Sequence, residues 1–152
     1  LKPDLDKKGP LSRTQMESFF KDGYLLLPGF YGNGCLDRCK HDVEGMIDKL
    51  ARRLVAAGKI KALYQDLDWT SRLLRMREDF ADAPVVLMKG GILPEAMQSM
   101  FSDPRILDIC EQLGLGPDLA LNPAWNLRGK MPKHEETVVP WHQDNSYWEP
   151  RI

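Results

Sequence analysis

The sequence predicts an α+β fold in which helices come first and strands follow near the C-terminus. Over much of residues 12–113, apolar residues recur at three- and four-residue steps, as on the buried face of a helix. A glycine- and proline-containing break at residues 114–117 ends this pattern, and short extended runs follow it. We therefore expect residues 12–113 to be mainly helical with two short strands, and residues 119–148 to be mainly extended.

The N-terminal part of the chain should form a short helix and then a short strand. Residues 1–11 are expected to be a flexible lead-in, because they are largely polar. Ser12 can cap the helix, with Gln15 in the reciprocal position of a capping box, and Gly23 should end it. Residues 24–27, Tyr-Leu-Leu-Leu, form an apolar run before a Pro-Gly pair, which predicts a strand.

The middle of the chain should contain four helices. The longest is expected over residues 34–57, and another over residues 70–80. Two more should cover residues 94–101 and 103–113, each with a proline in its first turn, where the missing amide hydrogen is tolerated. The apolar run at residues 85–88 predicts a short strand or extended segment. The core-facing residues of the longest helix are Leu36, Cys39, Val43, Ile47, Leu50 and Leu54.

The C-terminal region should be built from short extended runs. These are expected at residues 119–121 and 124–127. A polar loop at residues 129–136 then leads to another run at residues 137–139. We therefore expect only the first strands of a sheet within this sequence.

Length and composition are those of an ordinary single domain. The 152 residues suffice to bury a core, and 21 basic against 22 acidic side chains give a net charge of −1. A nearly neutral chain lacks the excess of basic residues that is typical of nucleic-acid-binding proteins, so nucleic-acid binding is not predicted. No stretch approaches the about 20 apolar residues that span a bilayer, so no membrane-spanning segment is predicted. No feature of the sequence indicates an oligomeric state.

The three cysteines, Cys35, Cys39 and Cys110, indicate a reducing compartment, because an odd and small number argues against a disulfide framework. We therefore expect an intracellular protein, with the cytoplasm as the simplest location. A zinc site at Cys35, Cys39 and His41 is disfavoured, since no second ligand pair completes a tetrahedron. The first residue is Leu rather than Met, so the chain is expected to be a processed or trimmed product.

A histidine and an aspartate near the C-terminus have the spacing of metal ligands. His142 and Asp144 are two residues apart, and on an extended strand such side chains project to the same face. One imidazole and one carboxylate are two of the three ligands in the two-His-one-carboxylate site. That site binds non-haem Fe(II) and leaves positions open for oxygen chemistry. The alternative is that Asp144 caps the turn into the Asn-Ser pair that follows it.

Two longer sequence blocks carry a family resemblance. Residues 125–148 read W-N-L-R-G-K-M-P-K-H-E-E-T-V-V-P-W-H-Q-D-N-S-Y-W, and residues 19–31 read F-F-K-D-G-Y-L-L-L-P-G-F-Y. Both resemble segments of the phytanoyl-CoA dioxygenase family, a branch of the 2-oxoglutarate-dependent oxygenases. The resemblance implies a double-stranded β-helix, a jelly-roll relative, wrapped by N-terminal helices. Residues 1–152 would form a single, apparently incomplete domain of that fold, comprising its helical part and the first strands up to the ligand motif.

The resemblance also implies which residues form the site. His142 and Asp144 match the first histidine and the aspartate of the family's iron triad. Tyr147 and Trp148 match an aromatic pair that lines the pocket, and plain core packing is the alternative for both. The third iron ligand and the arginine that clamps 2-oxoglutarate are expected beyond Ile152.

Further residues are candidates for binding the cosubstrate. Asn126 or Arg128 lies on the segment that faces 2-oxoglutarate or the substrate in relatives. Lys89 resembles a lysine that reaches the cosubstrate in some members, and a solvated lysine is the alternative. His134, in a loop expected to be exposed, could complete the metal site in place of the missing histidine.

The implied function is that of an Fe(II)- and 2-oxoglutarate-dependent dioxygenase that uses O2 to hydroxylate a small organic or acyl substrate. Halogenating relatives replace the metal-binding carboxylate by a small residue, whereas Asp144 is present here, which favours hydroxylation. The 152-residue chain alone is expected to be inactive and to bind Fe(II) weakly. Two other classes stay open: a truncated, non-catalytic binding or structural module of the same fold, and a cupin-type metal hydrolase or isomerase.

Overall fold

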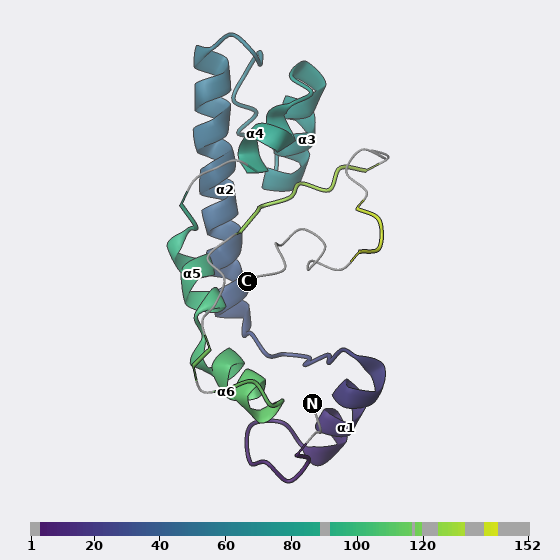
Figure 1. Ribbon diagram of the computed structural model, residues 1–152. Coiled ribbons are helices and arrows are strands. Elements are labelled where there is room, and N and C mark those ends of the chain that lie inside the picture. Colours follow the sequence, from purple (N-terminus) through teal and green to yellow (C-terminus); the bar gives the residue numbers. More distant parts are fainter. Residues whose placement is uncertain (1–3, 89–91, 117, 120–124, 133–138, 143–152) are drawn as a thin grey trace. The chain divides into compact units, whose positions relative to one another are not determined.

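The computed structural model describes residues 4–88, 92–116, 118–119, 125–132 and 139–142. Over these residues the chain forms six α-helices and no β-strand (Figure 1). The predicted α+β class, and the double-stranded β-helix that the resemblance implies, are therefore wrong for this part of the chain. Within the predicted extended region, three ranges lie outside the described residues: 120–124, 133–138 and 143–148.

The chain forms two compact units, which are described separately. The first unit comprises Leu1–Asp48 and Gly91–Trp125, and the second comprises Lys49–Gly90 and Asn126–Ile152. The helices of the first unit are α1 (Arg13–Asp22), α5 (Glu95–Phe101), α6 (Pro104–Gln112) and most of α2 (Asn33–Ala56). Those of the second are α3 (Trp69–Asp79), α4 (Ala83–Met88) and the end of α2.

The boundaries of α1 are those that the sequence predicts. The Ser12 hydroxyl accepts a hydrogen bond from the Gln15 amide, and the Gln15 side chain accepts one from the Ser12 amide, which confirms the capping box. Gly23 ends the helix in the left-handed conformation, with φ 79°, and its amide donates to the Phe19 carbonyl at 2.8 Å. Glycine adopts this conformation without the steric penalty that a Cβ would bring.

Residues 24–27 do not form the predicted strand. Their side chains do alternate as in a strand, because Tyr24 and Leu26 are 69% and 76% exposed while Leu25 and Leu27 are half-buried. No other described segment pairs with their backbone. A strand requires such a partner for its amide and carbonyl groups, so a strand-like side-chain pattern is not sufficient to form one.

The helix α2 buries the stripe that its sequence predicts, with one exception. Ile47 is fully buried, and Leu50 and Leu54 are 5% and 7% exposed. Leu36, in the first turn, is 38% exposed, so its predicted core position is wrong. The helical period assigns a residue to a face, whereas its burial depends on what covers that face at each turn. In the described ranges, no helix is both long and apolar enough to cross a bilayer.

The start of α3 is set by a local N-cap. The carboxylate of Asp68 accepts hydrogen bonds from the amides of Thr70 at 3.0 Å and Ser71 at 3.2 Å. Hydrogen bonds from Ser71 and Thr70 also hold the pKa of the Asp68 carboxyl well below its usual value. The helix begins at Trp69, one residue before the predicted start.

The run at residues 85–88, for which the sequence predicts a strand or extended segment, lies in α4, so that prediction is wrong. A short apolar run cannot be assigned to strand or helix by its period alone. Pro84 has the φ that suits the first turn of a helix, and the resulting helix packs against α3. Ala83, Pro84 and Leu87 are buried there.

The core of the first unit contains a buried polar side chain, Gln112 at the end of α6, which is 4% exposed. Its Oε1 accepts a hydrogen bond from the Leu11 amide at 2.7 Å. Its Nε2 lies 2.9 Å from the Leu11 carbonyl oxygen and 3.0 Å from that of Lys7. Two residues of the predicted lead-in, residues 1–11, are thus attached to α6 by the same amide.

Candidate functional site

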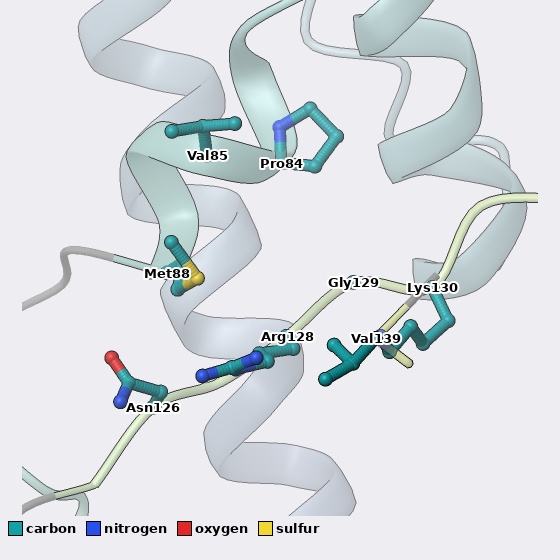
Figure 2. Close-up of a pocket in the computed structure, with 8 residues that line it drawn as sticks. All are labelled: Pro84, Val85, Met88, Asn126, Arg128, Gly129, Lys130 and Val139. Carbon is teal, nitrogen blue, oxygen red and sulfur yellow. The ribbon is translucent and has the colours of Figure 1, made fainter. Parts of the chain in front are cut away.

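A cavity in the second unit lies between α4 and residues 126–130 (Figure 2). Its volume is about 320 Å³, near the lower end of the range for small-molecule sites. Two of the residues that the sequence nominates for ligand binding, Asn126 and Arg128, line it. Its described lining residues are Pro84, Val85, Met88, Asn126, Arg128, Gly129, Lys130 and Val139.

One wall of the cavity is an extended segment whose side chains alternate. The exposed residues are Asn126, Arg128 and Lys130, and the half-buried ones between and after them are Leu127, Gly129 and Met131. In extended backbone, side chains two residues apart point to the same side, so the three polar groups share one side of the segment. The segment is not part of a sheet, so the extended run expected at residues 124–127 does not form one of the first strands of a sheet in its described residues 125–127.

Gly129 allows this wall to lie close to α3 and α4. A Cβ at this position would lie 3.3 Å from Cδ2 of Leu73, on α3, and 3.6 Å from Cβ of Pro84, on α4. It would also lie 3.1 Å from the terminal methyl of Met131. Because two of these distances are tighter than ordinary van der Waals contact, a larger residue would push the wall away from the helices.

The opposite wall is the apolar surface of α4, which contributes Pro84, Val85 and Met88 (Figure 2). Val85 is 45% exposed, and Val139, which also lines the cavity, is 39% exposed. Large apolar side chains that stay exposed around one cavity are a common feature of surfaces that a ligand covers. The cavity thus has an apolar side and a polar side.

The polar side carries positive charge. Arg128 and Lys130 are both exposed, and the described lining contains no acidic side chain. Arg128 forms no ion pair or hydrogen bond with any residue that the structure describes. Guanidinium groups pair with carboxylates in a planar, bidentate geometry, so an anion is the natural partner for Arg128.

His142 follows the cavity wall in the chain. It lies three residues after Val139, so the Cα atoms of the two residues are at most about 11 Å apart. The exposed imidazole has Nδ1 at 2.8 Å from the carbonyl oxygen of Pro140. When Nδ1 carries the proton and donates it to that carbonyl, Nε2 holds the lone pair that binds metals.

Lys89, His134, Asp144, Tyr147 and Trp148 all lie outside the described residues. Within the described ranges, no three His, Cys, Asp or Glu side chains are grouped so as to hold a metal ion. The contact between Nδ1 of His142 and a backbone carbonyl is of the kind that metal-binding histidines usually make through their second ring nitrogen.

Of the eight described lining residues, sequence reasoning nominated only Asn126 and Arg128 and missed the other six. The alternation in W-N-L-R-G-K-M, residues 125–131, could have added Lys130 to Asn126 and Arg128. No sequence pattern indicated Val85 and Met88. In the strand expected over residues 85–88, these two side chains would point to opposite faces, whereas in a helix residues three apart lie on the same face. Their position at the cavity depends on α4 and on its contact with the rest of the second unit.

A separate polar cluster surrounds Asp79, whose side chain is 4% exposed, at the end of α3. The Tyr64 hydroxyl donates a hydrogen bond to its Oδ2, and the Lys61 amide donates to the same oxygen at 3.0 Å. Nζ of Lys61 lies 3.4 Å and Nη1 of Arg75 lies 3.6 Å from Oδ1. The hydrogen bond from Tyr64 is the main reason that the pKa of Asp79 is lowered, to about 2.

Replacing Gly129 with valine is expected to loosen the extended wall. The added methyl groups would overlap Leu73 and Met131, and overpacking of this kind costs about 1–3 kcal/mol. Hydrogen exchange of the amides of residues 126–132 should therefore speed up. The control is Gly45→Val, because a Cβ at Gly45 meets nothing within 4 Å. Equal exchange of these amides in the two variants would contradict the close contact at Gly129.

Comparison with protein-family models, with curated proteins and with solved structures found no match for this chain. The site is therefore defined by its own residues. These are the apolar wall on α4, the three exposed polar residues Asn126, Arg128 and Lys130, and His142 three residues after Val139.

Proposed function

We propose that this chain is part of an Fe(II)- and 2-oxoglutarate-dependent dioxygenase that hydroxylates a small organic or acyl substrate. One observation carries the proposal. The cavity brings Asn126 and Arg128 together, and its wall at Val139 leads directly into the segment with His142. These residues come from the sequence block that resembles the phytanoyl-CoA dioxygenase family. A cavity, an arginine suited to pair with an anion and a candidate metal ligand are three of the parts that such chemistry requires.

In this proposal His142 and Asp144 hold the iron. A hydrogen bond from Nδ1 of His142 to the carbonyl of Pro140 orients the imidazole, as such bonds do in metal-binding histidines, and Nε2 would be the ligand atom. Iron, when bound, would supply the activation of dioxygen. Asp144 contributes a charged oxygen ligand, which favours hydroxylation over transfer of a halide.

The remaining residues of the cavity bind and orient the organic reactants. Arg128 pairs with an anionic group of the cosubstrate or the substrate, and the amide of Asn126 can donate a hydrogen bond to the same group. Val85 and Met88 present an apolar surface that excludes water from the bound molecule. Exclusion of water strengthens the pairing with Arg128 and limits side reactions.

The test is 2-oxoglutarate-dependent succinate release by the protein that carries this chain, supplied with Fe(II). We expect His142→Ala and Asp144→Ala each to lower it at least about 100-fold, since loss of a direct ligand exceeds the 10- to 100-fold effect of removing a supporting residue. Calorimetric titration with Fe(II) or Mn(II) should show weakened binding in both variants.

A matched control is His41→Ala. His41 is also a histidine with an exposed side chain, 88% accessible, and it lies on α2 next to Glu44. It should leave succinate release and metal binding unchanged. Undiminished succinate release by the Asp144→Ala variant would show that Asp144 is not a required ligand, and the dioxygenase proposal would lose its main residue-level support.

A further inference from the structure

The exposed apolar side chains around the cavity indicate what kind of ligand covers them. Val85 and Val139 are 45% and 39% exposed, yet both line the same cavity. Met88, half-buried on α4, adds a flexible apolar surface beside Val85 (Figure 2). Burying apolar area is favourable by about 25 cal/mol per Å², so a ligand with a hydrocarbon part would be stabilised on this side. A small polar dicarboxylate would leave these side chains without a partner.

The extended segment on the other side of the cavity indicates a negatively charged group in the ligand. Arg128 has no carboxylate partner in the part of the chain that the structure describes. Asn126 stands on the same side of the extended segment, two residues away, and can donate through its amide nitrogen. The described lining contains two basic side chains, Arg128 and Lys130, and no acidic one, whereas the chain as a whole has a net charge of −1.

We propose that this cavity binds an amphipathic carboxylate with a short to medium aliphatic chain. The carboxylate pairs with the Arg128 guanidinium and accepts a hydrogen bond from Asn126. The aliphatic chain lies on Val85, Met88 and Val139. A volume of about 320 Å³ suits a ligand of this size. The inference specifies the class of substrate for the proposed function. Binding of the carboxylate does not depend on that function, whereas the role of this ligand as the substrate rests on it.

Octanoate is the probe, titrated calorimetrically into the 152-residue chain in the presence of EDTA, which keeps metal out of the measurement. Octanol has the same chain length without the charge, and acetate has the charge without the chain. We expect octanoate to bind at least about tenfold more tightly than either, since one charge-assisted hydrogen bond is worth about 1.5–3 kcal/mol. Excess 2-oxoglutarate should not displace it.

Two variants separate the halves of the site. Arg128→Gln should weaken octanoate binding about tenfold or more and leave octanol binding unchanged. Val85→Asn should weaken binding of both octanoate and octanol, because it removes apolar contact. The control for Arg128→Gln is Arg53→Gln, which removes an exposed arginine of the same unit that is not part of this lining. Thermal unfolding of each variant shows whether it is folded.

The inference is overturned if octanoate binds no more tightly than octanol, or if Arg128→Gln and Arg53→Gln have the same effect. Its failure is distinguishable from failure of the proposed function. Octanoate binding that requires Arg128, in a protein without succinate release, supports the carboxylate site and identifies a binding module instead of an enzyme. Succinate release that requires Asp144, without octanoate binding, supports the dioxygenase and overturns the carboxylate site.

Discussion

Replacing Gln112 with alanine is expected to destabilise the first unit by about 2–4 kcal/mol. The Leu11 amide would lose its acceptor, and the carbonyl oxygens of Lys7 and Leu11 would lose their donor. A buried polar group without a partner costs about 1–3 kcal/mol, and the missing side chain leaves a cavity besides. Urea unfolding should show a lower midpoint without a change in slope.

The control for Gln112→Ala is Gln98→Ala. Gln98 is a glutamine on α5 in the same unit, but it is exposed, and its side-chain amide donates to the nearby carbonyl of Leu93. Its loss should change the unfolding free energy by no more than about 0.5 kcal/mol. If the two variants unfold at the same urea concentration, the attachment of the N-terminal residues to α6 does not stabilise the unit.

Gly9 provides an independent test of the same contact. A Cβ at Gly9 would lie 2.4 Å from Oε1 and 2.5 Å from Cδ of Gln112, so alanine there must displace the Gln112 side chain. Gly9→Ala should therefore be destabilising in the natural background and nearly neutral in the Gln112→Ala background. Such non-additivity is expected when two residues act through one contact.

The second large effect concerns Asp79 and acid stability. Its pKa is lowered in the folded protein from the usual 3.8 to about 2, first by the hydrogen bond from Tyr64 and then by the Lys61 amide. A lowered folded-state pKa contributes stability that is fully present above the unfolded-state value and is lost as the pH falls through the folded-state value. The second unit should therefore lose stability between about pH 4 and about pH 2.

Asp79→Asn should lower the melting temperature at neutral pH and flatten this acid transition. Asparagine has the same size, but it lacks the charge that attracts Lys61 and Arg75. The matched control is Glu78→Gln, at the neighbouring exposed position, whose ion pair with Arg75 is open to solvent. Thermal unfolding measured over a series of pH values gives both curves. An acid transition equally steep in Asp79→Asn and in the natural protein would contradict the assignment.

Much of the helical part of the fold could be predicted because its determinants are local. A cap requires only side chains within a few residues of the amides it satisfies, as at Ser12 and Asp68. The helical period alone assigns the apolar residues of α2 to one face, and Ile47 on that face is fully buried. The polar side of residues 126–130 was predictable for the same reason, since alternation in an extended segment is a local property.

The secondary-structure predictions were wrong where a short apolar pattern fits more than one type of backbone structure. The apolar run at residues 85–88 fits both a strand and a short helix, and contact with α3 accompanies the helix that forms. Residues 24–27 have the alternation of a strand, but a strand needs hydrogen-bonding partners from distant parts of the chain. The role of Gln112 was invisible for the same reason, because its partners Lys7 and Leu11 lie about a hundred residues away.

By itself, the sequence determined the start of α1, and those of α2, α3, α5 and α6 to within one residue. It also determined which face of α2 is apolar and the alternation that places Asn126 and Arg128 on one side of their segment. Only the tertiary structure decided that α4 is a helix and that its residues Val85 and Met88 complete the cavity. Capping and periodicity depend on atoms a few residues apart, which a single sequence displays directly. Which apolar surface faces a given polar segment depends on contacts across the fold, and those exist only once the chain has packed.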